Sequence, residues 1–377
     1  MSQERLDDRL HLPSLSIEGF RGIKELSIER LGRVTLLAGK NSVGKTTVLD
    51  AVQVYAARGH YGVLSSVLES HEEVAALTDG TGQERVGPYL EVLFHGRDAS
   101  QGAFLSIGPN DDSEQLVIEA VPPEGDSRST QQFPFLILNP SVKTFKIVFQ
   151  GQELTNSWFF SPYALSTKMV KNRRVYQSMG GFSFNKQSAA IACQSIGPEL
   201  LSNDTIVELW DAIALTEDED RVINALQPIL GHQVKRIAII GDDSNGRRVV
   251  AKIQDQAFPV PLKSLGDGAL RLFGVALILI NSRDGFLLID EAENGIHHSV
   301  QPDFWRMVFK TAHANNVQVI ATTHSFDCVR GFAQAAVECE EVEGALVRIE
   351  RKDEEMWAVE YSERDLRIAA EQRIEVR

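Results

Sequence analysis

The length, composition and charge of the chain limit what kind of protein it can be. Its 377 residues are 43% apolar and 24% charged, which is ordinary for a globular protein of two or three structural units. This composition excludes a disordered, collagen-like or disulfide-stapled chain. The net charge of −14 disfavours a bulk electrostatic grip on nucleic acid, so any nucleic-acid surface must be local.

The cysteines and the apolar runs bear on the compartment. Cys193, Cys328 and Cys339 form no close pair and show no zinc-ligand spacing, which favours structural thiols in a reducing compartment. The amino terminus has no apolar core and cannot act as a signal peptide. The apolar run at residues 272–280 is shorter than the roughly 20 residues of a membrane span. We therefore expect a cytoplasmic protein without membrane contact, with this run in a buried helix.

The first sixty residues have the pattern of strands, a loop and a helix. Apolar residues at 15–28 and the continuous apolar run at 34–38 predict strands. From Thr46 the pattern becomes helical and ends near Gly59. This order places a glycine-rich loop between a buried strand and a helix.

That loop matches the phosphate-loop pattern GxxxxGK[ST] in the structural context that the pattern requires. Its glycines allow successive backbone N–H groups to surround a phosphate, and the amino terminus of the helix adds positive potential. Lys45 would reach the β- and γ-phosphate oxygens, and the Thr46 hydroxyl would ligate Mg²⁺. The predicted nucleotide-binding residues here are Gly39, Lys40, Asn41, Ser42, Val43, Gly44, Lys45, Thr46 and Thr47.

The middle of the chain is a β-rich and then helical stretch. Alternating patterns at 89–94, 116–121, 135–138 and 145–148 predict strands, and a helical portion follows at about 204–230. Two strands at 234–240 and 248–253 are predicted to pair across a turn at 241–246. No period of 20–50 residues repeats and no heptads are sustained, so long coiled-coil arms are not expected.

From Pro261 onward helices and apolar strands alternate again, as in a wound sheet. We predict a helix at 267–281, a strand at 285–289, a helix at 300–314, a strand at 317–321 and a further helix. Asp290 and Glu291 follow the first of these strands, where ligands of open α/β sheets bind. Asp290 would complete the Mg²⁺ shell and Glu291 would polarise the attacking water. His324, at the end of the next strand, could contact the γ-phosphate or that water.

Two further features are weaker on their own. Ser264 and Gly266 open the apolar helix, and exposed amides at a helix start can bind a second phosphate. His297 and His298 have no evident third ligand, so metal binding through them is not favoured.

Taken in order, the phosphate loop, the Ser-x-Gly helix start, the strand with Asp-Glu and the Thr-His-Ser segment resemble ABC-type ATPase heads of the SMC and RecF group, and most of all the OLD-like ATPases. The resemblance covers about residues 12–60 and 260–330. It implies an α/β, ABC-type P-loop NTPase head with a wound β-sheet, interrupted by a β-rich and helical insertion. The implied parts are residues 1–60 and 256–377 of one ATPase domain and residues 61–255 as its elaboration.

The resemblance also implies roles for individual residues. Lys45, Glu291 and His324 would be catalytic, residues 264–268 the signature segment, and residues 293–295 a dimer-contact loop. Arg21, in the segment IEGFRG, would lie near the nucleotide. Lys263, Leu265 and Asp267 depart from the usual signature sequence.

The resemblance implies a mechanism in which two heads sandwich two ATP molecules with Mg²⁺, so that the chain is at least an ATP-dependent dimer. Too few residues follow His324 for the TOPRIM nuclease domain of OLD nucleases, so we expect no nuclease in this chain. By analogy with ATPase subunits of prokaryotic anti-phage systems, the partner would be a separately encoded effector such as a nuclease or toxin. The alternative is a RecF- or SMC-like ATPase of DNA repair or recombination.

Two other classes are disfavoured, and one local feature bears on partners. The full signature of a transporter motor is absent, as is the guanine-binding Asn-Lys-x-Asp of a GTPase, whose nearest match is residues 185–188. The segment at 154–198 has basic and aromatic residues but no acid. It could contact nucleic acid or an acidic protein, or form a solvated face. Its basic residues are Lys168, Lys171, Arg173, Arg174 and Lys186.

Overall fold

A six-stranded, mostly parallel sheet forms the centre of the protein. The structure is a computed structural model that describes residues 10–78, 84–99, 102–112, 114–121, 144–154, 190–230, 234–241 and 246–362, with Asp365 and Ile368. The central sheet has the order β10 (Cys193–Ile196), β14 (Phe286–Ile289), β15 (Gln318–Thr323), β3 (Val34–Ala38), β16 (Gly344–Lys352) and β17 (Glu355–Tyr361). Its strands from β10 to β16 are parallel, and β17 returns antiparallel to β16.

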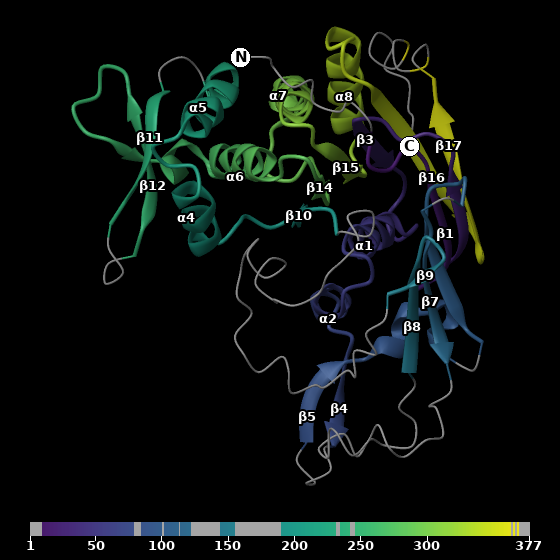
Figure 1. The fold of residues 1–377 in the computed structure, drawn as a ribbon. Coiled ribbons are helices and arrows are strands. Elements are labelled where there is room, and N and C mark those ends of the chain that lie inside the picture. The colour runs from purple at the N-terminus through teal and green to yellow at the C-terminus, as the bar shows by residue number, and fades with distance from the viewer. Residues whose placement is uncertain are drawn as a thin grey trace, which may run out of the picture.

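A second six-stranded sheet is antiparallel and lies beside the first, with β2 next to β17 (Figure 1). Its order is β2 (Ile23–Ile28), β1 (Leu15–Phe20), β6 (Phe104–Gly108), β7 (Leu116–Val121), β8 (Thr144–Phe149) and β9 (Gln152–Glu153). A two-stranded sheet of β4 (Val74–Thr78) and β5 (Glu84–Pro88) extends from this part.

Helices cover both faces of the central sheet, as Figure 1 shows. On one face α1 (Lys45–Ala56) and α2 (Tyr61–Ser70) share a core with the antiparallel sheet. On the other lie α6 (Asp267–Asn281), α7 (Gln301–Ala314) and α8 (Phe326–Glu338). Successive side chains of β14 alternate between the cores: Phe286 and Leu288 enter the first, Leu287 and Ile289 the second. A strand buried on both faces is apolar throughout, as β14 is.

A helical and β-sheet lobe precedes α6. It contains α4 (Asn203–Asp211), α5 (Glu217–Leu230) and a three-stranded sheet of β11 (Val234–Ile240), β12 (Arg248–Ile253) and β13 (Val260–Pro261). Trp210 of α4 packs against Phe273 of α6 with ring centroids 5.6 Å apart. The lobe therefore rests on α6 and leads through the short helix η6 (Leu262–Leu265) directly into it.

The expected α/β class with a wound sheet is confirmed, and so are most individual elements. The strands at 116–121, 234–240 and 248–253 and the helix at 267–281 have the predicted bounds. The apolar run at 272–280 is buried within α6, and among the described residues no helix is both long and apolar enough to cross a bilayer. The expected strand at 135–138 lies outside the described residues.

One predicted element is wrong. Residues 89–94 do not form a strand but include the 3₁₀ helix η1 (Leu90–Leu93), because the spacing of three residues turns Leu90 and Leu93 to the same apolar pocket. The helical portion expected at about 204–230 is confirmed and consists of two helices, α4 and α5. Between them Leu215 is 98% exposed with a φ of 62°, and the Thr216 hydroxyl accepts a hydrogen bond from the Asp218 N–H, which begins α5.

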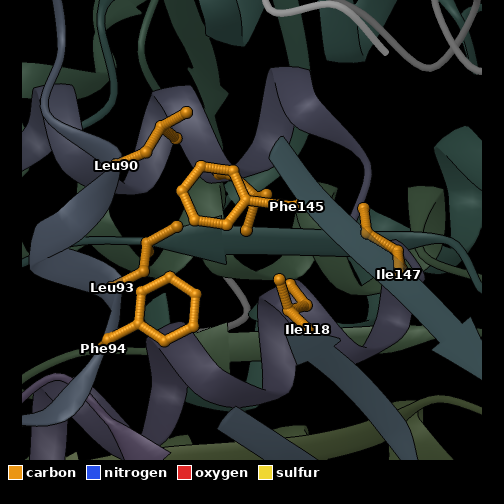
Figure 2. A pocket seen from close by; sticks show the side chains of 7 residues that line it. Leu90, Leu93, Phe94, Ile118, Phe145 and Ile147 are labelled. Carbon is orange, nitrogen blue, oxygen red and sulfur yellow. The ribbon is translucent and has the colours of Figure 1, made fainter. Parts of the chain in front are cut away.

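Figure 2 shows that apolar pocket, between α2, η1, β7 and β8. Every side chain that lines it is hydrocarbon, so it offers no polar group to a phosphate or a base. We assign it to the core of the antiparallel sheet and not to the nucleotide site. The labelled lining residues are Leu90, Leu93, Phe94, Ile118, Phe145 and Ile147.

Candidate functional site

The phosphate loop joins the carboxyl end of β3 to the start of α1. Gly39 has a φ of 151°, and a Cβ there would lie 2.6 Å from the carbonyl oxygen of Ile349. Gly44, the N-cap of α1, has a φ of 105°, which only glycine adopts easily. Among the described residues no side chain caps this helix, so its first N–H groups face the loop. This geometry suits an anion.

Lys45 is the buried cation of the loop. Its side chain is held inside the loop because Nζ donates to the carbonyl oxygens of Gly39, at 2.9 Å, and Lys40, at 2.8 Å. Burial lowers the pKa of Lys45, and the carboxylates that follow β14 oppose that shift. The other predicted loop residues lie at the surface or are partly buried: Lys40, Asn41, Ser42 and Thr46 are exposed, and Val43 and Thr47 are partly buried.

A hydroxyl and a carboxylate meet where α1 begins and β14 ends. The Thr46 hydroxyl donates to both oxygens of Asp290, at 3.2 Å and 3.0 Å. Thr322, at the end of β15, donates its hydroxyl to Asp290 as well and accepts the Glu291 N–H at 2.9 Å. An oxygen pair of this kind is the donor set that Mg²⁺ takes alongside water and phosphate. The residues present therefore fit the expected Mg²⁺ site of Thr46 and Asp290.

Glu291 begins the loop after β14 and has a left-handed φ of 49°. Its backbone N–H is bound by Thr322, and its Oε2 accepts a hydrogen bond from Asn294 Nδ2 at 2.7 Å. The side chain is 38% exposed, so water can reach it. Glu291 is thus a carboxylate with a fixed backbone and one hydrogen-bonded oxygen, next in sequence to Asp290.

His324 lies between two carboxylates. Its Nδ1 is 3.2 Å from Glu293 Oε1 and 4.0 Å from Glu291 Oε1. Its side chain is 40% exposed, whereas that of Glu293 is 12% exposed. Because β14, β15 and β3 are neighbouring parallel strands, the structure brings Lys45, Asp290, Glu291 and His324 to one edge of the sheet.

The predicted signature segment lies on the surface at the start of α6. Ser264 and Gly266 are exposed, and Gly266 has a φ of 103° as the N-cap of the helix. The next glycine, Gly268, touches the loop after β14, since a Cβ there would lie 2.7 Å from the Gly295 carbonyl oxygen. The segment is therefore in contact with the loop that carries Glu291 and is open to a second molecule. Its nucleotide contact stays a prediction.

The described ion pair of Arg21 is with a residue outside the phosphate loop. Its guanidinium forms an ion pair with Glu73 at 2.9 Å, and both side chains are nearly buried. Arg97 pairs with the same carboxylate at 2.7 Å. Nearby, His71 binds Asp50 of α1 at 2.9 Å, and this hydrogen bond raises the pKa of His71. The contact of Arg21 with a nucleotide stays a prediction.

The structure describes the histidine pair but not the basic residues at 168–186. The rings of His297 and His298 lie with their centroids 4.0 Å apart and their planes tilted by 40°, and His297 caps a short helix by accepting the Ser299 N–H. The segment with Lys168, Lys171, Arg173, Arg174 and Lys186 lies outside the described residues.

Arg271 of α6 was not singled out in the sequence analysis. It is 2% exposed, and its guanidinium donates to the carbonyl oxygens of Gly197, Glu199 and Asp290. Burial lowers the pKa of Arg271, and the carboxylates of Asp290, Glu293 and Glu291 oppose that shift. A single charged residue within the otherwise apolar run at 269–280 was the signal that could have identified it.

The fold and the phosphate loop define an α/β P-loop NTPase head. Models of AAA-type ATPase domains match two stretches of the chain, and both stretches extend into the middle segment at 61–255. The model described as "AAA domain" matches residues 14–174. The model described as "AAA domain, putative AbiEii toxin, Type IV TA system" matches residues 195–327. Both stretches are therefore similar to AAA-type ATPase domains.

Individual relatives give a similar result. An "ATP/GTP phosphatase" of Helicobacter pylori is 19% identical over 325 residues, which cover 83% of this chain and 85% of that protein. An uncharacterized protein of Methanocaldococcus jannaschii is 34% identical over 92 residues, covering 24% of this chain and 80% of the relative. The chain belongs to the same family as that archaeal protein. The ATP/GTP phosphatase relative and the matches to AAA-type domains support nucleoside triphosphate hydrolysis as the general activity.

Two solved structures overlap with most of the chain. The SMC head domain from Thermotoga maritima is 13% identical, with a TM-score of 0.47, covering 94% of this chain and 100% of that one. An SMC head bound to the C-terminal winged-helix domain of ScpA is 14% identical, with a TM-score of 0.47, covering 94% and 98%.

Proposed function

We propose that this protein hydrolyses ATP and that ATP-dependent assembly of at least two copies controls a separately encoded effector, in prokaryotic antiviral defence. The observation that carries the hydrolysis is the placement of Lys45, the Thr46–Asp290 pair, Glu291 and His324 at one sheet edge. The effector role is supported by the toxin-related family model that matches residues 195–327.

Each residue has a distinct part in the proposed reaction. Lys45 and the N–H groups of the phosphate loop bind the β- and γ-phosphates. Thr46 and Asp290 would hold Mg²⁺, which neutralises phosphate charge when bound. Glu291 orients a water and accepts its proton as the water oxygen attacks the γ-phosphorus and ADP leaves. His324 contacts the γ-phosphate.

The assembly step rests on the exposed start of α6. In the proposed dimer, ATP bound to the phosphate loop of one copy also contacts residues 264–268 of the other. Gly268 touches the Gly295 carbonyl, so docking at the signature segment would act on the loop that carries Glu291. ATP then stabilises the assembled form because it binds that form more tightly.

Replacing Lys45 with methionine should weaken ATP binding while leaving the fold intact. Charge-assisted hydrogen bonds contribute about 1.5–3 kcal/mol, which corresponds to roughly a 10- to 100-fold rise in Kd. Calorimetric titration with ATP measures the effect. The control is Lys24→Met, which removes an exposed lysine of β2 and should leave the Kd unchanged. Equal Kd values for the Lys45 variant and wild type would contradict the assigned phosphate site.

The effector proposal is tested by affinity purification of the Glu291→Gln protein from its native host with ATP present. Bound proteins are identified by mass spectrometry and bound nucleic acid by sequencing, with Lys45→Met as the control that cannot retain ATP. Recovery of a nuclease or toxin with only one of the two variants would support the proposal. Recovery of DNA with recombination proteins would favour the repair function instead.

Phosphate release with ATP and with GTP, measured on the purified wild type, tests the preference for ATP.

A further inference from the structure

Both carboxylate oxygens of Glu293 accept hydrogen bonds. Its Oε1 accepts the backbone N–H of His324 at 3.0 Å, and its Oε2 accepts the hydroxyl of Thr323 at 2.8 Å. Both bonds come from the residues that end β15. The side chain is 12% exposed, so this carboxylate is anchored at the strand end and is largely shielded from solvent.

The same carboxylate faces the ring of His324. Nδ1 lies 3.2 Å from Glu293 Oε1, closer than the 4.0 Å that separates it from Glu291 Oε1. The other oxygen of Glu291 is bound to Asn294. Two neighbouring glutamates therefore have different partners: Glu293 binds the histidine, and Glu291 stays the carboxylate that water can reach.

We propose that Glu293 is a positioning residue for ATP hydrolysis: its carboxylate holds the Nδ1–H of His324, so that Nε2 is the ring nitrogen left to contact the γ-phosphate. This inference rests on the proposed function. A carboxylate that accepts one ring N–H fixes both the tautomer and the orientation of an imidazole. Rotation of the ring by 180° would place Cδ2 where Nδ1 lies and lose the contact with Glu293.

Two cations lie within electrostatic range of Glu293. Arg271, buried beneath the site, and Lys45 both interact electrostatically with Glu293. These two cations offset the three carboxylates Asp290, Glu291 and Glu293. Glu293 belongs to the loop at 293–295, which the sequence resemblance assigns to dimer contact. Its contact with His324 lies within one chain, so the loop would have a second role.

The kinetic test compares Glu293→Gln with wild type. Glutamine has the same shape but lacks the charge, and only its carbonyl oxygen, one of its two polar atoms, can accept the Nδ1–H. We expect kcat to fall about 10- to 100-fold, with KM for ATP and the ATP-dependent mass unchanged. Glu293→Asp restores a carboxylate and should recover part of kcat. The control Glu354→Gln removes an exposed carboxylate of the β16–β17 turn and should leave kcat unchanged.

A double-mutant cycle with His324→Ala separates positioning from a structural role. If Glu293 acts through His324, adding Glu293→Gln to His324→Ala should cause no further loss of kcat. A further loss equal to that of the single Glu293 variant would overturn the proposal, as would an unchanged kcat in Glu293→Gln.

Nuclear magnetic resonance of the ¹⁵N-histidine-labelled protein tests the contact without relying on catalysis. The His324 signals are assigned by their disappearance in His324→Ala. In wild type we expect the signals of a His324 ring that carries its proton on Nδ1. In Glu293→Gln we expect part of that population to carry the proton on Nε2 instead. A His324 ring that carries its proton on Nε2 in both proteins would overturn the proposal. Wild type without ATPase activity but with the expected ring signals would refute the proposed function and not the Glu293–His324 contact.

Discussion

Replacing Glu291 with glutamine is expected to lower kcat for ATP hydrolysis by about 10²–10⁴-fold, the range of a lost general base, while ATP still binds. Lys45, the phosphate loop and the Thr46–Asp290 pair are untouched by this change. Glutamine can still accept the Asn294 amide through its carbonyl oxygen, so the loop should keep its shape. Steady-state phosphate release and ATP titration measure the two effects separately.

The same variant should accumulate as an ATP-bound dimer or larger oligomer, because ATP that is not hydrolysed continues to stabilise the assembled form. Light scattering with and without ATP measures the mass. Lys45→Met is the matched control and should stay unassembled under both conditions. A mass of the Glu291→Gln protein that does not change with ATP would contradict the sandwich, whereas kcat close to wild type would remove Glu291 from the reaction.

Residues of the site that follow a strand directly could be predicted from sequence, because local geometry decides their placement. The phosphate loop needs only an apolar strand before it and a helix after it. Asp290 and Glu291 end a four-residue apolar strand, and His324 follows another. Parallel strands end at the same sheet edge, so three local patterns predicted residues that the structure brings together. Their chemical roles stay predictions until they are measured.

Features that depend on long-range pairing could not be predicted in this way. β10 lies far from the phosphate loop in sequence, yet it pairs with β14 in the central sheet. β16 pairs with β3 across most of the chain length. The contact of Glu293 with His324 likewise depends on how β14 and β15 are aligned. No local periodicity indicates which distant strand or side chain a residue will contact. The 3₁₀ geometry at Leu90 and Leu93 likewise depends on the pocket that these side chains line.

Arg271 illustrates the same limit and carries the largest expected effect on stability. Replacing it with methionine keeps much of its apolar bulk but leaves the carbonyl oxygens of Gly197, Glu199 and Asp290 without this donor. It also leaves the carboxylates beside it without a buried cation. Removing one partner from a buried charge network costs about 3–5 kcal/mol. We expect a loss of this size in the free energy of unfolding, measured by urea denaturation.

The matched control is Arg221→Met on α5. Arg221 is 50% exposed and pairs with Asp218 at 2.7 Å, and exposed pairs of this kind contribute about 0–1 kcal/mol. Both variants remove one arginine that binds acceptors in its own chain. A larger loss in the free energy of unfolding for Arg271→Met therefore reports the burial of Arg271 and not the removal of a charge alone. Because Arg271 also binds the carbonyl of Asp290, any folded Arg271→Met protein should have weakened Mg²⁺-dependent ATP turnover. Equal stability losses in the two variants would show that Arg271 does not hold α6 to the end of β14.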